Sequence, residues 1–220
     1  EVGAAVTSVK PGDFVVGSFC ASCGECEICQ AGYPSRCQRA IEAGEAYVRG
    51  AQAEYLRVPF ADGTLVATPS KPDPELIPDL LAASDVLGTG WFAADAAGAG
   101  PGKTIAVVGD GAVGLGAVIG ARQLGAKRVI AMSRHEARAK LAREFGATDV
   151  VAERGEEGAA KVKELTGGYG AHGTAEAVGT EQAMQQALAS TRYGGYVGFV
   201  GVPHGGTISV DQLFGKEVHL

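Results

Sequence analysis

The stretch TIAVVGDGAVG, residues 104–114, decides the fold. Residues 104–108 are typical of a buried parallel strand, and a G-x-G-x-x-G turn follows at once. From Ala112 to Leu124 the apolar residues recur at helical spacing, and residues 128–132 predict the next strand. A glycine turn in this context lets the backbone approach a pyrophosphate, whose charge the helix N-terminus meets. We therefore expect a dinucleotide to bind at Gly109, Gly111, Ala112, Val113 and Gly114.

The same alternation continues along the rest of the chain. Helices are predicted near residues 135–145, 157–165 and 182–189, and strands at 149–151, before Gly179 and at 196–200. Strands separated by helices of this length predict an α/β fold with a doubly wound parallel sheet, which binds its ligand at the carboxyl ends of the strands. We expect cofactor contacts at the carboxyl ends of the last two strands, at Val178, Gly179, Val200, Gly201 and Val202. The alternative is that Gly179 and Gly201 merely end these strands.

The end of the second predicted strand bears on the choice of cofactor. An NAD enzyme usually offers a carboxylate there to the ribose hydroxyls, whereas this chain has Ser133 and Arg134. Serine does not repel a 2′-phosphate and arginine can clamp it, so the sequence favours NADP(H) over NAD(H). Arg138, one helical turn onward, supports this interpretation. The alternative is that Arg134 is a solvated surface residue.

All five cysteines fall within eighteen residues. The odd count argues against a disulfide framework, and C-x2-C-x2-C-x7-C suits four thiolates around one zinc ion. A site with four sulfurs has no open position, so we expect structural zinc at Cys23, Cys26, Cys29 and Cys37. Buried structural cysteines, a redox-active pair and an iron–sulfur cluster are the alternatives. Cys20 stands outside the spacing and is interpreted as a small buried hydrophobe.

Charge and hydropathy exclude several classes of partner. The formal net charge is -6, and acidic and basic residues are interspersed, so no basic stripe suits nucleic acid and no polybasic segment suits a membrane surface. No apolar run is long enough to span a bilayer. We interpret the chain as part of a soluble, cytoplasmic protein. It starts without Met and ends on the apolar run 218–220, which resembles a strand just begun, so we expect a piece of a longer chain.

A cysteine lobe followed by a dinucleotide-binding unit resembles the zinc-dependent medium-chain alcohol dehydrogenases. Residues 9–16 are similar to the family's strand and turn before the lobe, 53–59 to the strand that returns from it, and 200–203 to the strand end beside the nicotinamide. The resemblance implies that residues 1–74 are part of a mostly β, GroES-like catalytic domain that carries the zinc lobe. It implies that residues 75–220 are linking helices and a Rossmann domain that lacks its C-terminal part.

The resemblance also implies a second, catalytic zinc ion. Glu1 looks like the Glu of the family's Gly-His-Glu sequence, and Asp85 matches its third zinc ligand. Thr89 falls at a position that touches the nicotinamide. The implied reaction is hydride transfer between a small alcohol or carbonyl compound and NADP(H) or NAD(H), in a homodimer or homotetramer of the full-length protein. Without the family, Asp85 could equally be the N-cap of a helix through residues 91–97.

Two other functions remain open at this point. A zinc-free NADPH-dependent quinone or enoyl reductase would keep the Rossmann half and lack both metals. A non-catalytic fragment would only bind dinucleotide and structural zinc. None of the four histidines has ligand spacing to another. His172 interrupts a strand that is more apolar in the family that the chain resembles, which leaves the local stability or the exact course of that strand open.

Overall fold

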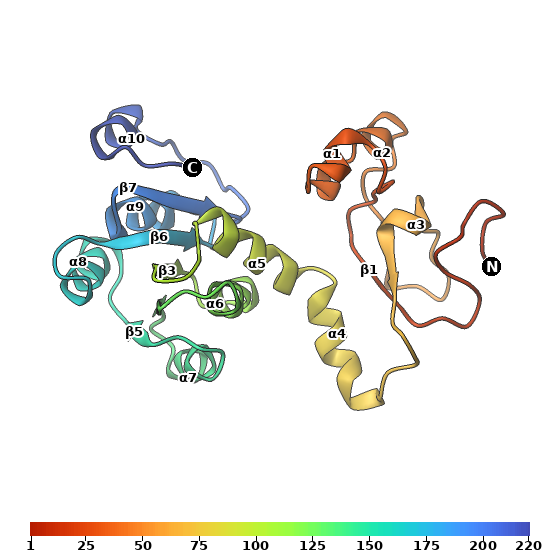
Figure 1. The fold of residues 1–220 in the computed structure, drawn as a ribbon, viewed down its shortest axis with the longest axis horizontal. Coiled ribbons are helices and arrows are strands. Elements are labelled where there is room, and N and C mark those ends of the chain that lie inside the picture. The colour runs from red at the N-terminus through yellow and green to blue at the C-terminus, as the bar shows by residue number, and fades with distance from the viewer. The chain divides into compact units, whose positions relative to one another are not determined.

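The computed structural model describes residues 1–220, which divide into two compact units, Glu1–Asp85 and Val86–Leu220 (Figure 1). The first unit contains short elements only. They are β1 (Val15–Gly17), α1 (Glu27–Gln30), η1 (Pro34–Arg36), α2 (Gln38–Glu42), α3 (Ala61–Thr64), β2 (Leu65–Ala67), η2 (Pro74–Leu76) and α4 (Ile77–Ala83). No helix of the 220 residues is long and apolar enough to cross a membrane.

The first unit is built on one antiparallel strand pair and a cysteine-rich lobe. β1 pairs with β2, with Val16 opposite Val66, and the chain between them forms the lobe. The lobe has a small core of its own, made of Ala21, Cys37 and Ala40. Asp62 joins the N-terminal segment to this unit, because its carboxylate accepts hydrogen bonds from the backbone and side chains of residues 7 and 8, and these bonds lower the pKa of Asp62 to about 2.

The strand predicted at residues 53–59 is not a strand in the structure. The segment has no regular secondary structure, and the Tyr55 side chain is 91% exposed. A β-strand needs a neighbouring strand to take its backbone hydrogen bonds, and none of the strand pairs in the structure includes this segment. The sequence pattern is compatible with a strand, but among residues 1–220 the pairing partner is absent.

The second unit has the predicted doubly wound fold. Its sheet is fully parallel, in the order β5-β4-β3-β6-β7. Three strands have the predicted bounds, and the predicted helices form within a few residues of theirs. The elements are α5 (Val86–Ala96), β3 (Thr104–Val108), α6 (Ala112–Gln123), β4 (Arg128–Met132), α7 (Glu136–Glu144), β5 (Asp149–Val151), α8 (Gly155–Leu165), β6 (Ala171–Glu176), α9 (Glu181–Ser190), β7 (Thr191–Phe199) and α10 (Val210–Lys216).

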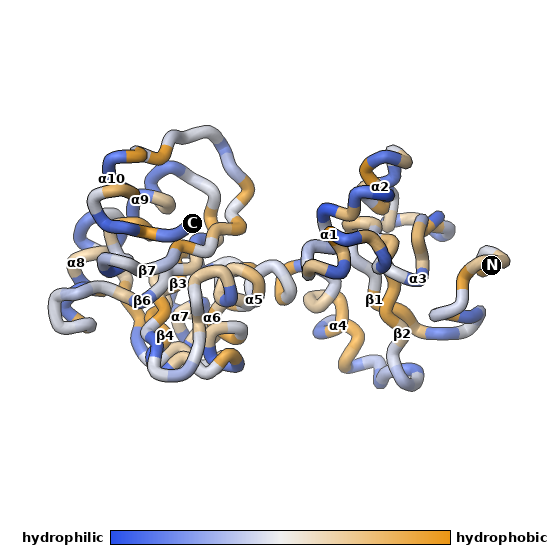
Figure 2. Tube along the Cα trace, turned by 45° about the horizontal axis from the view of Figure 1, so that its top comes forward, coloured by the Kyte–Doolittle hydropathy of each residue, from blue (hydrophilic) through white to orange (hydrophobic).

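Helices cover both faces of this sheet. Successive strand residues point to opposite faces, so the apolar residues of one strand contribute to the cores on both sides. Ile105 and Val107 of β3 pack in one core with residues of α5 and α6, whereas Ala106 and Val108 pack in the other with residues of α8 and α9. Figure 2 shows the hydrophobic colour along β4 in the interior. A Cβ atom added to Gly90 would lie 2.4 Å from the Ala117 nitrogen, so glycine is required for α5 and α6 to pack this closely.

The course of the last two strands differs from the simple prediction. The pairing of β6 with β7 shifts register between Ala171 and Gly173, at His172. The His172 ring is half-buried at this register shift, and its Nδ1 accepts a hydrogen bond of 3.1 Å from the Thr104 N–H group. β7 begins at Thr191, five residues before the predicted start at residue 196. The apolar end of the chain makes one parallel bridge to this strand, from His219 to Tyr196.

Candidate dinucleotide crevice and zinc lobe

The glycine turn after β3 has the geometry that a close ligand requires. Gly109 has a φ of +116°, a conformation that only glycine adopts readily. A Cβ atom on Gly114 would lie 2.0 Å from the Gly109 carbonyl oxygen, so the first turn of α6 can only pack on the loop without a side chain there. Around Gly111, by contrast, nothing lies within 4 Å of an added Cβ atom, and Gly111 and Ala112 are exposed. The backbone N–H groups in the first turn of α6 have no partner within the helix, and the space beside Gly111 is open.

A crevice of about 330 Å³ opens where β3 and β6 end side by side. These neighbouring strands lead to helices on opposite faces of the sheet, which is the topological switch point where doubly wound folds bind ligands. The structure brings five of the predicted cofactor residues to its lining, namely Gly109, Gly111, Ser133, Arg134 and Val178. Ala112, Val113 and Gly114 form the adjoining helix start, whereas Arg138, Gly179, Val200, Gly201 and Val202 do not line the crevice.

The loops after β6 and β7 pack directly on each other through glycine. A Cβ atom on Gly201 would lie 2.0 Å from the Gly179 nitrogen, and one on Gly179 would lie 2.0 Å from the Val202 carbonyl oxygen. Close backbone packing is thus sufficient to explain both glycines, and their contact with a cofactor stays a prediction.

A buried carboxylate that the sequence analysis missed orders these loops. Glu176 is only 1% exposed, and its Oε1 accepts hydrogen bonds of 2.8 Å from the N–H groups of Val178 and Gly179. Its carbonyl oxygen accepts from the N–H groups of Val200 and Gly201. Glu176 therefore ties together the ends of β6 and β7. The available signal was a single acidic residue at the carboxyl end of a predicted buried strand.

A second missed carboxylate, Asp110, lies inside the glycine turn. The Ser133 hydroxyl donates a 2.8 Å hydrogen bond to Asp110 Oδ2, and Arg138 Nη1 forms an ion pair of 3.0 Å with Oδ1. Burial of the carboxyl raises its pKa, but the Ser133 and Arg138 bonds outweigh burial, and the net effect is a lowered pKa of Asp110. Arg138 is therefore already paired. Arg134 is exposed at the crevice and forms no ion pair.

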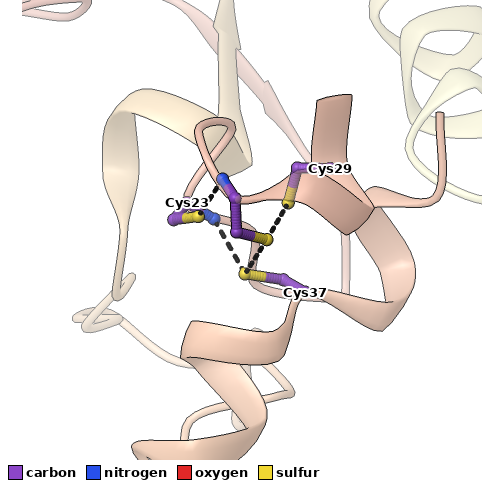
Figure 3. Close-up of side chains that lie close together, drawn as sticks. Cys23, Cys29 and Cys37 are labelled. Carbon is purple, nitrogen blue, oxygen red and sulfur yellow. Dashed lines mark hydrogen bonds between the residues drawn. The ribbon is translucent and has the colours of Figure 1, made fainter. Parts of the chain in front are cut away.

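The four predicted zinc ligands converge in the lobe of the first unit. The sulfur atoms of Cys23, Cys26, Cys29 and Cys37 all lie within 4.8 Å of one another. The Cys26 sulfur lies 3.4 Å from that of Cys29 and 4.0 Å from that of Cys37. A tetrahedral zinc site with bonds of about 2.3 Å has sulfur atoms about 3.8 Å apart, so the cluster fits the ion. Figure 3 shows the labelled cysteines turned toward one another.

Backbone N–H groups donate hydrogen bonds to the sulfur atoms of this cluster. Ala40 and Cys23 donate to the Cys37 sulfur, at 3.4 and 3.3 Å, and Cys26 donates to the Cys23 sulfur. The N–H group of Cys29 lowers the pKa of Cys26 to about 6. Burial opposes ionisation of Cys37, but N–H donation from Cys23 and Ala40 prevails and lowers its pKa. Burial raises the pKa of Cys29 to about 11. The lobe therefore favours the thiolate, the form that binds zinc, at Cys26 and Cys37 and opposes it at Cys29.

The fifth cysteine is separate from this cluster. Cys20 is 6% exposed, does not belong to the group of four, and has a pKa raised by burial. These properties confirm its interpretation as a small buried hydrophobe. All five cysteines are free of disulfides.

None of the residues implied in catalysis by the family resemblance belongs to the group of potential metal ligands that the structure assembles. Glu1 is exposed at the start of the chain, Asp85 is the exposed last residue of the first unit, and Thr89 is half-buried in α5. The four cysteines form the sole group of three or more potential ligand side chains within residues 1–220. The structure therefore does not bring Glu1 and Asp85 together with a third ligand, and their role stays a prediction.

Comparison with known proteins gives consistent results over the whole chain. A model of the alcohol dehydrogenase GroES-like domain matches residues 1–70, and a model of the zinc-binding dehydrogenase family matches residues 112–220. The zinc-type alcohol dehydrogenase B of Aspergillus flavus is 38% identical over 212 residues, which cover 93% of this chain and 49% of the relative. A medium chain reductase/dehydrogenase of an Acremonium species is 37% identical over 212 residues, which cover 93% of this chain and 71% of the relative.

Solved structures agree. The apo form of zinc dependent alcohol dehydrogenase 2 from Streptococcus pneumonia superposes with a TM-score of 0.86 and 30% identity, over 100% of this chain and 62% of that one. A Sinorhizobium meliloti 1021 protein bound to NADP superposes with a TM-score of 0.77 and 28% identity, over 100% of this chain and 64% of that one. The chain thus spans about half the length of the Aspergillus flavus relative and under two thirds of these solved chains. It belongs to the zinc-binding medium-chain alcohol dehydrogenase family.

Proposed function

We propose that the whole protein is a zinc-dependent alcohol dehydrogenase or carbonyl reductase that transfers hydride between a small alcohol or carbonyl compound and NADP(H), with NAD(H) as the weaker cofactor. The observation that carries the proposal is the crevice at the switch point between β3 and β6, which is lined by the glycine turn and by Arg134. The bound nicotinamide would supply or accept the hydride.

The residues of this chain would bind and orient the cofactor. Gly111 and Ala112 are exposed at the start of a twelve-residue helix, whose first N–H groups have no partner within the helix, and this suits a pyrophosphate. Arg134 is a free cation in the lining, which suits a 2′-phosphate, and the NADP-bound relative from Sinorhizobium meliloti supports this assignment. Thr89 is assigned to the nicotinamide by family resemblance.

The two metal roles in the proposal are separate. The four cysteines leave zinc no open position, so the lobe would contribute folding free energy without touching the substrate. Asp85 and Glu1 are proposed, from the family pattern, as ligands of a second zinc ion that would polarise the alcohol oxygen. A homodimer or homotetramer and a cytoplasmic location are part of the proposal and rest on the resemblance alone.

The decisive test is zinc per chain in the intact parent protein, measured by elemental analysis. We expect about two zinc ions, falling to about one in Asp85→Ala, with alcohol oxidation lost and NADPH binding retained. The matched control is Asp79→Ala, which removes an exposed carboxylate of α4 and should keep both metals. One zinc ion in the parent and in both variants would overturn the proposal in favour of a zinc-free reductase or a non-catalytic binding module.

A further inference from the structure

A second cavity, of about 270 Å³, lies at the amino ends of the parallel strands. The dinucleotide crevice lies at their carboxyl ends. The residues that line it come from the amino ends of four strands and from the loop between α8 and β6. Those with polar side chains are Thr104, Arg128, Thr166, Tyr169, His172 and Arg192. Nothing in the proposed hydride transfer uses this cavity.

The lining of the cavity contains two arginines and no carboxylate. Arg128 is already satisfied, because its Nε and Nη2 bind both oxygens of Asp149 at 2.7 Å and its Nη1 donates to the Leu165 carbonyl oxygen. Arg192 is different. It forms no ion pair, and its Nε is buried without any hydrogen-bond acceptor. A buried donor on a charged group without a partner is costly, so the Arg192 guanidinium is prepared for an acceptor that residues 1–220 do not provide.

His172 adds a second donor to the same space. Its Nδ1 accepts the Thr104 N–H group, so the neutral ring must carry its proton on Nε2. Burial lowers the pKa of His172, and the positive charges of Arg192 and Lys103 lower it further. Lys103 is exposed and also has no ion pair. Uncompensated positive charge therefore gathers around a cavity lined by hydrogen-bond donors.

We propose that this cavity binds a small phosphate-bearing anion, with Arg192 as its main ligand and His172 as a second donor. A guanidinium binds phosphate through a planar fork of N–H groups, and the guanidinium of Arg192, which lines the cavity, donates no hydrogen bond to any group of residues 1–220. The volume lies just below the range of about 300–1,000 Å³ that is typical of drug-sized ligands, so the ligand is a phosphate or a short phosphate ester. The site is independent of the dinucleotide crevice.

Nuclear magnetic resonance of the His172 ring in the 220-residue chain tests this proposal without any variant. Inorganic phosphate is titrated in, with chloride adjusted to constant ionic strength. We expect a saturable shift of the His172 resonances and a raised pKa of His172, because a neighbouring anion stabilises the imidazolium. An absence of saturation, or the same change with chloride alone, would overturn the proposal. Comparison with glycerol phosphate then shows whether the free anion or an ester binds more tightly, and tighter binding of either supports the site.

Variants assign the binding to the cavity. Arg192→Gln should weaken phosphate binding by roughly tenfold or more, since it removes a charged hydrogen-bond donor. Arg143→Gln, an exposed arginine of α7, and Arg134→Gln, at the other edge of the sheet, should leave the His172 response unchanged. If Arg192→Gln does not fold, Arg192→Lys is the second variant, because it keeps the positive charge and lacks the planar fork of N–H groups. It should bind phosphate more weakly than the unmodified 220-residue chain. Equal affinity in the Arg192 variant that folds would refute the assignment.

Discussion

At the scale of single residues, Asp110 changes the interpretation of the end of β4. The sequence has Ser133 and Arg134 at this strand end, where a carboxylate is expected in an NAD enzyme, but the Asp110 carboxylate reaches Ser133 from the glycine turn and pairs with Arg138. Arg138 is therefore not a free cation, and the case for NADP(H) depends on Arg134. Replacing Ser133 by aspartate would place a second carboxylate beside Asp110, so Arg134 is the cleaner position for a test.

We predict that Arg134→Gln weakens NADPH binding by about tenfold and leaves NADH binding unchanged, since only NADPH presents a 2′-phosphate for a charged hydrogen bond. Fluorescence titration of the 220-residue chain with both cofactors measures the change. The matched control is Arg143→Gln, which removes an exposed arginine outside the crevice. An equal loss for NADH and NADPH would show that Arg134 does not distinguish them.

At the scale of elements, His172 links β6 to the neighbouring strand β3 through the Thr104 N–H group. The lone pair on Nδ1 that accepts this bond is lost when the ring is protonated. Because burial lowers the folded-state pKa of His172 below 6.5, the unfolded chain takes up the proton first as the pH falls. The stability that His172 contributes is complete above pH 6.5 and is lost as the pH falls toward the lower folded-state value.

We therefore predict that His172→Asn reduces the loss of stability between about pH 7.5 and about pH 5.5, since an amide does not titrate there and its oxygen can still accept the Thr104 N–H group. Urea unfolding in phosphate-free buffer, followed by the fluorescence of Trp91, the only tryptophan, provides the measurement. The comparison variant is His135→Asn, which removes an exposed histidine. The same pH dependence in the parent chain and in His172→Asn would contradict the assignment.

At the scale of the whole molecule, the two units depend on different sources of stability. The second unit has two large hydrophobic cores, one on each face of its sheet. The cysteine lobe has only three buried core residues, and two of its ligand thiols have lowered pKa values that favour the charged form. Four thiolates without a cation would repel one another, so we expect zinc to hold the lobe together.

We predict that Cys26→Ser loses the bound zinc and makes residues 1–85 sensitive to protease, while the unfolding of the second unit stays unchanged. Elemental analysis, proteolysis followed by mass spectrometry, and Trp91 fluorescence measure the three effects. Cys20→Ser is the matched control and should retain the metal, because Cys20 lies outside the cluster. Loss of zinc in both variants, or a protease-resistant lobe without zinc, would refute this account.

Strands were predicted correctly from the sequence where neighbouring residues alone determine them. The bounds of β3, β4 and β5 were predicted because short apolar runs between turns are set by neighbouring residues. The prediction of a strand at residues 53–59 was wrong, because a strand forms only beside a partner strand. The residues of the segment itself do not determine whether such a partner is present. The early start of β7 at Thr191 was missed for the same reason, since pairing with Ala171 extends it beyond its apolar run.

The sequence by itself determined the doubly wound second unit and the set of four zinc ligands. Both follow from spacing over a few residues, because hydrophobic periodicity selects strands and helices and short loops confine cysteines to one space. Only the tertiary structure decided the pairing of Asp110 with Ser133 and the closure of two loops by Glu176. It alone placed Arg192 and His172 at one cavity. These contacts join atoms that come together only after the sheet has formed, so their geometry depends on packing and is not encoded in any local pattern.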